Sequence, residues 1–184
     1  MLDLTSAFAC GHGLFVRTVF LLRHAKSSWS DPALPDEERP LAPRGERAAR
    51  SIAAYLRREK LRPDRVLCSP SVRTRQTLAA IEPSLGKGCS VEFVPELYAA
   101  SADVLLEQLR LLPGSVESVM VIGHNPGLHD LALALASRGK DLPRLAVKYP
   151  TGALATLAVR GDAWTALDHG DAELVGFVVP RELD

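Results

Sequence analysis

An arginine and a histidine follow directly on a short apolar run near the start of the chain. The run Thr18-Val19-Phe20-Leu21-Leu22 precedes Arg23-His24-Ala25. A neutral imidazole at the end of a buried strand is a nucleophile, and a guanidinium beside it keeps its charge and grips anionic oxygens with two parallel N–H groups. The pair therefore indicates phosphoryl transfer, although an isolated Arg-His pair is more often an ordinary strand end at the surface.

A second histidine occupies a similar position about a hundred residues later. Residues 118–122 predict a strand, which Gly123-His124-Asn125-Pro126-Gly127 ends. Ligands bind at the carboxyl ends of the strands in open α/β sheets, so we expect His24 and His124 to meet at one sheet edge. The alternative is that His124 only caps the helix that follows it.

A third segment places an arginine at a helix start. Ser69-Pro70-Ser71 predicts the beginning of a helix, with Arg73 on its first turn. There the guanidinium and the positive end of the helix would hold the same phosphate. The alternative for Arg73 is a salt bridge to the acidic, proline-rich stretch 31–43. We expect that stretch to be a surface connection that overhangs the site.

Composition limits the class of protein. With 184 residues, of which 47% are hydrophobic and 24% charged, the chain is expected to form one domain over residues 17–184, after a flexible extension at 1–16. Equal numbers of cationic and anionic residues argue against non-specific nucleic-acid binding. Three widely spaced cysteines predict neither a disulfide framework nor a zinc site and suit the cytoplasm. No apolar run has the length of a membrane span.

Short β-rich runs alternate with longer helical ones along the chain. This pattern predicts an α/β fold, a three-layer α/β/α sandwich with a mostly parallel central sheet and an antiparallel edge in the last third. The predicted strands are 18–22, 65–68, 91–94, 118–122, 153–159 and 174–179, and the predicted helices are 44–60, 69–81, 102–112 and 128–137.

Together these segments resemble the histidine phosphatase superfamily, which has the phosphoglycerate-mutase-like fold, and within it the SixA-like phosphohistidine phosphatases. The resemblance rests on Leu22 to Trp29, Arg39-Pro40-Leu41 with Arg44-Gly45, Cys68-Ser69-Pro70 with Arg73 and Gln76-Thr77, Glu96-Leu97-Tyr98, Gly123 to Leu128, and Pro150-Thr151-Gly152-Ala153. It implies that His24 becomes phosphorylated, that Arg23, Arg73 and His124 bind the phosphoryl group, and that no metal or other cofactor is needed. Asn125 and Ser27 lie in the same motifs and are predicted to bind substrate.

One departure from the larger mutase and phosphatase branch bears on the substrate. That branch has Gly and Glu after the Arg-His pair and a helical insertion over the substrate, whereas Ala25 and Lys26 follow here and the segment 81–91 is short. An open site is implied, which suits a phosphorylated protein side chain. Glu96 is the candidate general acid, and its alternative is a turn carboxylate that binds local backbone N–H groups.

The expected function is a metal-independent phosphatase with a phosphohistidyl-enzyme intermediate that acts on phosphohistidine in proteins. A phosphohistidine leaving group has a basic nitrogen that can be protonated before departure, so a strong enzymic acid is unnecessary. Two alternatives stay open. The first is a phosphomonoesterase or mutase acting on small phosphate esters, and the second is a non-catalytic module that binds phosphorylated partners.

Overall fold

A seven-stranded sheet, in the order β3-β2-β4-β1-β6-β7-β5, forms the middle layer of the described part of the chain. The computed structural model describes residues 17–183, so the predicted extension at 1–16 lies outside the described residues. The strands are β1 (Arg17–Arg23), β2 (Arg65–Cys68), β3 (Ser90–Phe93), β4 (Ser118–Gly123), β5 (Ala136–Arg138), β6 (Leu154–Val159) and β7 (Ala172–Val178).

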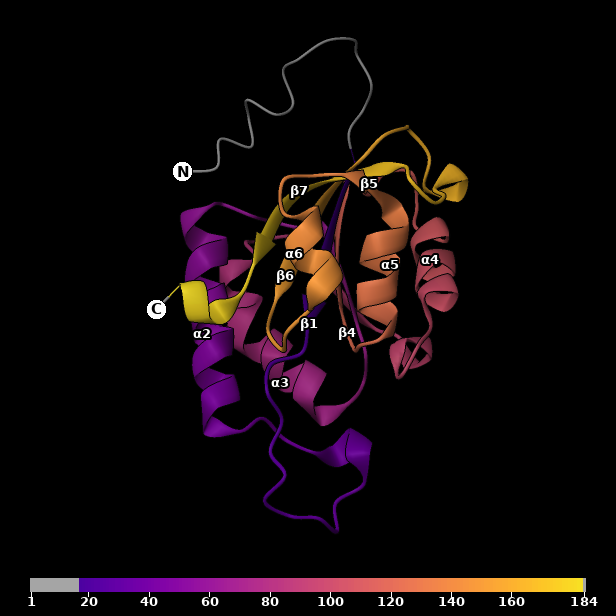
Figure 1. Ribbon diagram of the computed structural model, residues 1–184. Helices are drawn as coiled ribbons and strands as arrows, with labels where there is room; N and C mark the ends of the chain where they lie inside the picture. The colour runs from indigo at the N-terminus through magenta and orange to yellow at the C-terminus, as the bar shows by residue number, and fades with distance from the viewer. Residues whose placement is uncertain (1–16, 184) are drawn as a thin grey trace.

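Helices cover both faces of this sheet, as Figure 1 shows. They are α2 (Pro43–Arg58) and α3 (Val72–Ile81) on one face, and α4 (Ala102–Arg110), α5 (Gly127–Leu135) and α6 (Leu142–Val147) on the other. Short 3-10 turns connect them: η1 (Asp36–Glu38), η2 (Glu82–Ser84), η3 (Pro95–Leu97), η4 (Trp164–Ala166) and η5 (Pro180–Glu182).

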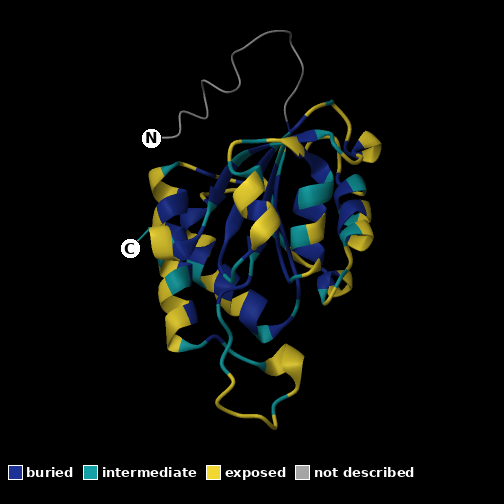
Figure 2. Cartoon of the chain, in the orientation of Figure 1, coloured by how far each residue is buried: buried dark blue, intermediate teal, exposed yellow. Residues whose placement is uncertain are grey.

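The alternation of side chains along β1 explains the three layers. Phe20 and Leu22 pack into the apolar cluster that contains Ile52 of α2, while Val19 and Leu21 pack into the cluster on the opposite face. Successive strand residues point to opposite faces, so a strand whose central residues 19–22 are all apolar must be covered on both sides. Figure 2 shows the buried sheet between helices whose outer faces are exposed. The predicted α/β/α sandwich is confirmed.

The sheet is mostly parallel, but its antiparallel strand is not at an edge. Strands β1, β4, β2 and β3 run parallel to one another, whereas β6 runs antiparallel to both β1 and β7. Strand β6 therefore lies inside the sheet, and the edges are β3 and β5. Its composition suits this place, because five of its six residues are apolar.

The prediction of one helix over 128–137 was wrong at its carboxyl end. Helix α5 ends at Leu135, and the next three residues form β5. Ala136 takes an extended backbone and pairs with Ala172 of β7. This pairing with a distant strand overrides the local helical pattern. The six-residue helix α6 was not predicted, because it is too short to display a helical period.

The carboxyl ends of β1, β2 and β4 reach the same edge of the sheet. Register pairs Arg23 of β1 with Gly123 of β4, and Cys68 of β2 with Ile122. The residues that follow these three strands are therefore neighbours in space, at the lower end of the sheet in Figure 1. No helix in the described residues is long and apolar enough to cross a membrane.

Candidate active site

His24 follows β1 directly and is held from both sides. Its backbone N–H donates to the carbonyl of Gly123 at 3.1 Å, and the N–H of Ala25 donates to Oγ1 of Thr77 on α3 at 3.1 Å. The imidazole Nδ1 lies 2.8 Å from the carbonyl oxygen of Ala25. A carbonyl only accepts, so Nδ1 carries the proton and Nε2 keeps its lone pair. The ring nitrogen that can attack is therefore Nε2.

Burial keeps the His24 ring neutral. Only 8% of the residue is exposed. Its pKa is lowered to about 4, chiefly by desolvation, and the positive charges of Arg73 and Arg23 lower it further. At neutral pH the ring is a free base, which is the form that a nucleophile requires.

His124 follows β4 and lies against His24, with the two ring centroids 5.1 Å apart. Its Nδ1 lies 3.3 Å from Nη2 of Arg73, and its Nε2 lies 2.8 Å from Oγ of Ser69. A guanidinium only donates, so Nδ1 accepts and Nε2 carries the proton toward Ser69. The pKa of His124 is lowered to about 3, chiefly by burial and further by the electrostatic effects of His24 and Arg73. No side-chain hydrogen bond caps the start of α5, and His124 accepts from the N–H of Leu128 at 3.0 Å only through its backbone carbonyl, so its imidazole does not cap the helix.

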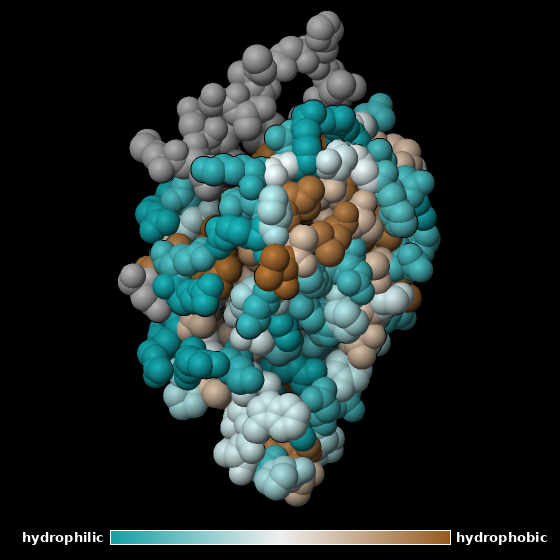
Figure 3. Space-filling model, viewed as in Figure 1, coloured by the Kyte–Doolittle hydropathy of each residue, from teal (hydrophilic) through white to brown (hydrophobic). Residues whose placement is uncertain are grey.

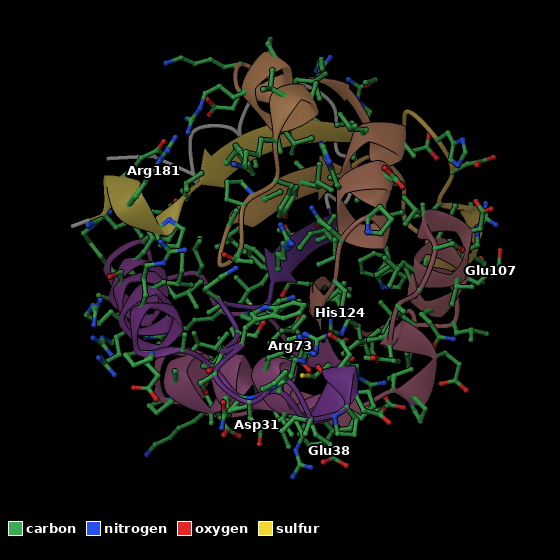
Figure 4. All side chains as sticks on the ribbon, turned by 60° about the horizontal axis from the view of Figure 1, so that its bottom comes forward. Asp31, Glu38, Arg73, Glu107, His124 and Arg181 are labelled. Atoms are coloured by element: carbon green, nitrogen blue, oxygen red, sulfur yellow. The ribbon has the colours of Figure 1, made fainter. Side chains whose placement is uncertain are left out.

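Arg73 is the second residue of α3 and lies beside His124, as Figure 4 shows. It is buried, with 6% exposure. Its Nη2 also forms an ion pair with Oδ2 of Asp36 at 2.8 Å, and its Nη1 donates to the backbone carbonyl of Asp36. Arg73 therefore forms the salt bridge to the acidic loop that the alternative predicted, and it also faces His124, while its role in phosphate binding stays a prediction.

Arg23 is anchored by a backbone carbonyl on the other side of the cluster. Its Nη1 donates to the carbonyl of Tyr149 at 2.7 Å, and Nδ2 of Asn125 donates to the same oxygen at 3.1 Å. Among the described residues, the buried Nε of Arg23 has no hydrogen-bond partner. Asn125 therefore shares an anchor with Arg23, and its predicted role in substrate binding stays a prediction.

Asp36 and Tyr98 form the rim of this cluster. The Tyr98 hydroxyl donates to Oδ2 of Asp36 at 2.9 Å, and the Tyr98 ring meets the His124 ring edge-on at 5.5 Å. Desolvation raises the pKa of Asp36, but the hydrogen bonds from Tyr98 and Arg73 outweigh it and hold that pKa below the ordinary carboxyl value. The composition of residues 31–43 indicated an acidic loop but did not single out Asp36 within it.

The remaining predicted residues lie farther out. Glu96 is exposed on η3 and forms no hydrogen bond or ion pair with any described residue. Ser27 forms an isolated β-bridge with Leu41, which closes the loop after the site. The roles of Glu96 and Ser27 stay predictions. In the described part of the chain, no group of three or more His, Cys, Asp or Glu side chains is arranged to hold a metal ion.

Comparison with known proteins agrees with this geometry. The model of the histidine phosphatase superfamily (branch 1) matches residues 19–108, which include His24 and Arg73. The phosphohistidine phosphatase SixA of Escherichia coli is 34% identical over 110 residues, which are 59% of this chain and 67% of that protein. The chain belongs to the histidine phosphatase superfamily.

Two further relatives extend the likeness along the chain of this histidine phosphatase. An uncharacterized protein of Mycobacterium tuberculosis is 39% identical over 164 residues, covering 87% of this chain and 100% of that protein. The structure of the protein histidine phosphatase SixA complexed with tungstate is 28% identical, with a TM-score of 0.74 over 91% of this chain and 99% of that chain. The protein is thus a SixA-like phosphatase. Between the end of α3 and the start of β3, the chain contains only one short turn, η2.

Proposed function

We propose that this histidine phosphatase removes phosphate from phosphohistidine side chains of proteins through a phosphohistidyl intermediate on His24. The observation that carries the proposal is the hydrogen bond from Nδ1 to the Ala25 carbonyl, at 2.8 Å. It orients the ring and leaves Nε2 unprotonated beside two guanidinium groups. This arrangement is that of a positioned nucleophile next to an anion clamp.

The reaction has two steps. Nε2 of His24 attacks phosphorus in line, a bond forms between Nε2 and phosphorus, and the bond from phosphorus to the substrate nitrogen breaks. The substrate imidazole takes up a proton from solvent on its other ring nitrogen before that bond breaks, so it departs as a neutral ring. Water then attacks the phosphorus on His24, the Nε2–phosphorus bond breaks, and inorganic phosphate leaves with His24 again neutral.

In this mechanism three groups stabilise the equatorial oxygens in both steps. Arg23 offers its unpartnered Nε, and Arg73 offers the Nη2 that Asp36 occupies in the free enzyme. His124 takes up a proton on Nδ1 or changes tautomer to donate, because a phosphoryl dianion favours the charged or donor form. Removing one such donor typically costs about two to three orders of magnitude in rate.

Asp36 is better placed than Glu96 to assist the leaving group. Its carboxylate contacts both Arg73 and Tyr98 at the rim, whereas Glu96 contacts neither. When phosphate displaces Asp36 from Arg73, the carboxylate loses a cation and gains an anionic neighbour, which raises its affinity for a proton. A phosphohistidine nitrogen needs little of this help, and a phosphate ester needs more.

A protein substrate is favoured by the short chain between α3 and β3. Among the described residues no helical insertion lies there, and the loop that carries Asp36 contacts the site through Arg73. The tungstate that the SixA relative binds is a tetrahedral oxyanion of the same shape as a phosphoryl group.

The test compares a phosphohistidine-containing protein with a panel of small phosphate esters. We expect turnover of the phosphohistidine protein and a phosphoenzyme that is acid-labile, base-stable and unaffected by a chelator. His24→Ala should abolish both, while His169→Ala, a change of an exposed histidine, should abolish neither. A normal turnover rate in His24→Ala would refute the mechanism. Binding of vanadate without any turnover would indicate the non-catalytic module.

Glu96→Gln and Asp36→Asn separate the two substrate classes. We expect both variants to keep most of their phosphohistidine turnover, with ester turnover falling more in Asp36→Asn. Equal losses on phosphohistidine and on esters would favour the phosphomonoesterase or mutase.

A further inference from the structure

A cavity of about 550 Å³ lies beside the four-residue cluster of Arg23, His24, Arg73 and His124. Its wall contains five cationic side chains and no acidic one. We name it the basic groove and define it by these cations: Lys26, Arg44, Arg47, Lys148 and Arg181. They come from four separate segments of the chain, namely the loop after β1, the first turns of α2, the residue after α6, and η5.

No described residue compensates the positive charge of the basic groove. None of its five cations forms an ion pair or a side-chain hydrogen bond with another described residue. The acidic residues closest to them in sequence are engaged elsewhere, since Glu46 pairs with Arg50 at 4.0 Å and Glu182 pairs with Arg144 at 2.6 Å. Because the whole chain has a formal net charge of zero, this is a local concentration of charge rather than a general excess.

Backbone contacts attach the groove to the catalytic edge of the sheet. The N–H of Ala42 donates to the carbonyl of Lys26 at 2.9 Å, and a Cβ on Gly45 would lie 2.1 Å from the same oxygen. The start of α2 is therefore fixed against Lys26, two residues after His24.

The opposite wall is fixed in the same way. Gly152 donates to the carbonyls of Arg23 and His24 at 3.1 and 3.0 Å, and its neighbour Thr151 lines the groove. A Cβ on Gly152 would lie 2.8 Å from Pro180, which packs η5 beside α2. Figure 4 shows Arg181 on η5 to one side of Arg73 and His124. In Figure 3 hydrophilic side chains gather on this flank of the molecule.

We propose that the basic groove binds an acidic segment of the phosphorylated protein substrate, a stretch of Asp and Glu residues near the phosphorylated side chain. This inference rests on the proposed protein substrate. Four of the five cations are exposed, and the five come from four separate segments, an arrangement that matches a row of carboxylates on a flexible segment. Charge complementarity of this kind gives specificity and salt-sensitive association rather than tight binding.

The test uses two phosphohistidine peptides of equal length, one with Glu and the other with Gln around the phosphohistidine. The groove variant is Arg44→Gln/Arg181→Gln. The matched control is Arg62→Gln/Arg160→Gln, which removes the same charge from two exposed arginines outside the groove. We expect the wild type to prefer the Glu peptide by about tenfold in kcat/KM, mainly through KM, as two solvated ion pairs would give.

The groove variant should lose this preference, while the control keeps it. Raising the salt concentration from about 50 to about 300 mM should weaken the wild-type preference several-fold. Turnover of phosphoramidate, which has no flanking segment, measures the phosphoryl pocket alone. A loss on phosphoramidate as large as the loss on the Glu peptide would place these arginines in the phosphoryl pocket and overturn the inference.

A binding measurement separates this inference from the proposed function. Binding of an unphosphorylated Glu-rich peptide to His24→Ala requires no turnover, so it tests the groove even if phosphohistidine is not the substrate. We expect binding that weakens about tenfold when Arg44→Gln/Arg181→Gln is added. No binding, or equal binding in both proteins, refutes the groove. A thymidine oligonucleotide that binds as tightly as the peptide, with the same loss, would show a general polyanion surface and would also refute it.

Discussion

Two buried neutral histidines make the stability of this histidine phosphatase sensitive to mild acid. His24 and His124 are 8% and 7% exposed, and burial lowers their pKa values to about 4 and about 3. In the unfolded chain a histidine titrates near pH 6.5. Between pH 6.5 and 5 the unfolded chain therefore binds protons that the folded protein does not, so lowering the pH favours unfolding.

The size of the effect follows from the number of histidines and the pH interval. Each histidine contributes about 1.4 kcal/mol per pH unit once the pH is below the unfolded value. At pH 5 this amounts to about 2 kcal/mol for each ring and about 4 kcal/mol for the pair. Most carboxylates titrate below pH 5, so the two histidines dominate the change in the free energy of unfolding between pH 6.5 and 5.

Urea unfolding at pH 7, 6, 5.5 and 5 measures this difference. We expect the free energy of unfolding of the wild type to fall by about 4 kcal/mol from pH 7 to 5, and that of His24→Asn or His124→Asn to fall by about 2 kcal/mol. The exposed His169, changed to Asn, serves as control and should keep the full dependence. A wild-type change below about 1 kcal/mol, or the same change in all four proteins, would contradict the reasoning.

Three substitutions test other contacts. Asp36→Asn removes the exposed partner of Arg73, so vanadate should bind about fivefold more tightly in an inhibition assay, whereas weaker binding would mean that Asp36 positions Arg73. Ser69→Ala removes the acceptor for His124, and kcat/KM should fall by about tenfold, with unchanged kinetics counting against this tautomer. Gly152→Ala places a Cβ 2.8 Å from a proline ring at a φ of +77°, so urea unfolding should show a loss of about 1 to 3 kcal/mol.

The parallel part of the fold was predictable because its pattern is local. Strands β1, β2 and β4 are short apolar runs, and α2 carries buried residues at helical spacing, so periodicity identifies them. Strand β5 and helix α6 were not predictable in this way. The three residues of β5 continue a helical pattern and become a strand only because β7 lies beside them. The antiparallel place of β6 likewise depends on where the chain re-enters the sheet.

The cluster of Arg23, His24, Arg73 and His124 was predictable for a different reason. Each residue ends a strand, follows one or lies on the first turn of a helix, and the carboxyl ends of parallel neighbours share an edge of the sheet. The register of the sheet then converts two motifs about a hundred residues apart into ring centroids 5.1 Å apart. Side-chain hydrogen bonds, such as that between His124 and Ser69, follow from atomic positions that a motif does not specify.

Asp36 is the clearest example of a site residue that sequence alone does not identify. It lies in a loop without periodicity, and its position depends on backbone groups elsewhere in that loop. The N–H of Leu41 donates to Gln76 of α3 at 2.7 Å, and Ser27 bridges Leu41, so both ends of the loop are attached beside α3. That attachment brings Asp36 to Arg73 across 37 positions of sequence. Asp36 therefore joins the site through the contacts of its neighbours. A variant that removes the Gln76 acceptor of the Leu41 N–H should weaken the ion pair between Asp36 and Arg73 without altering either charge.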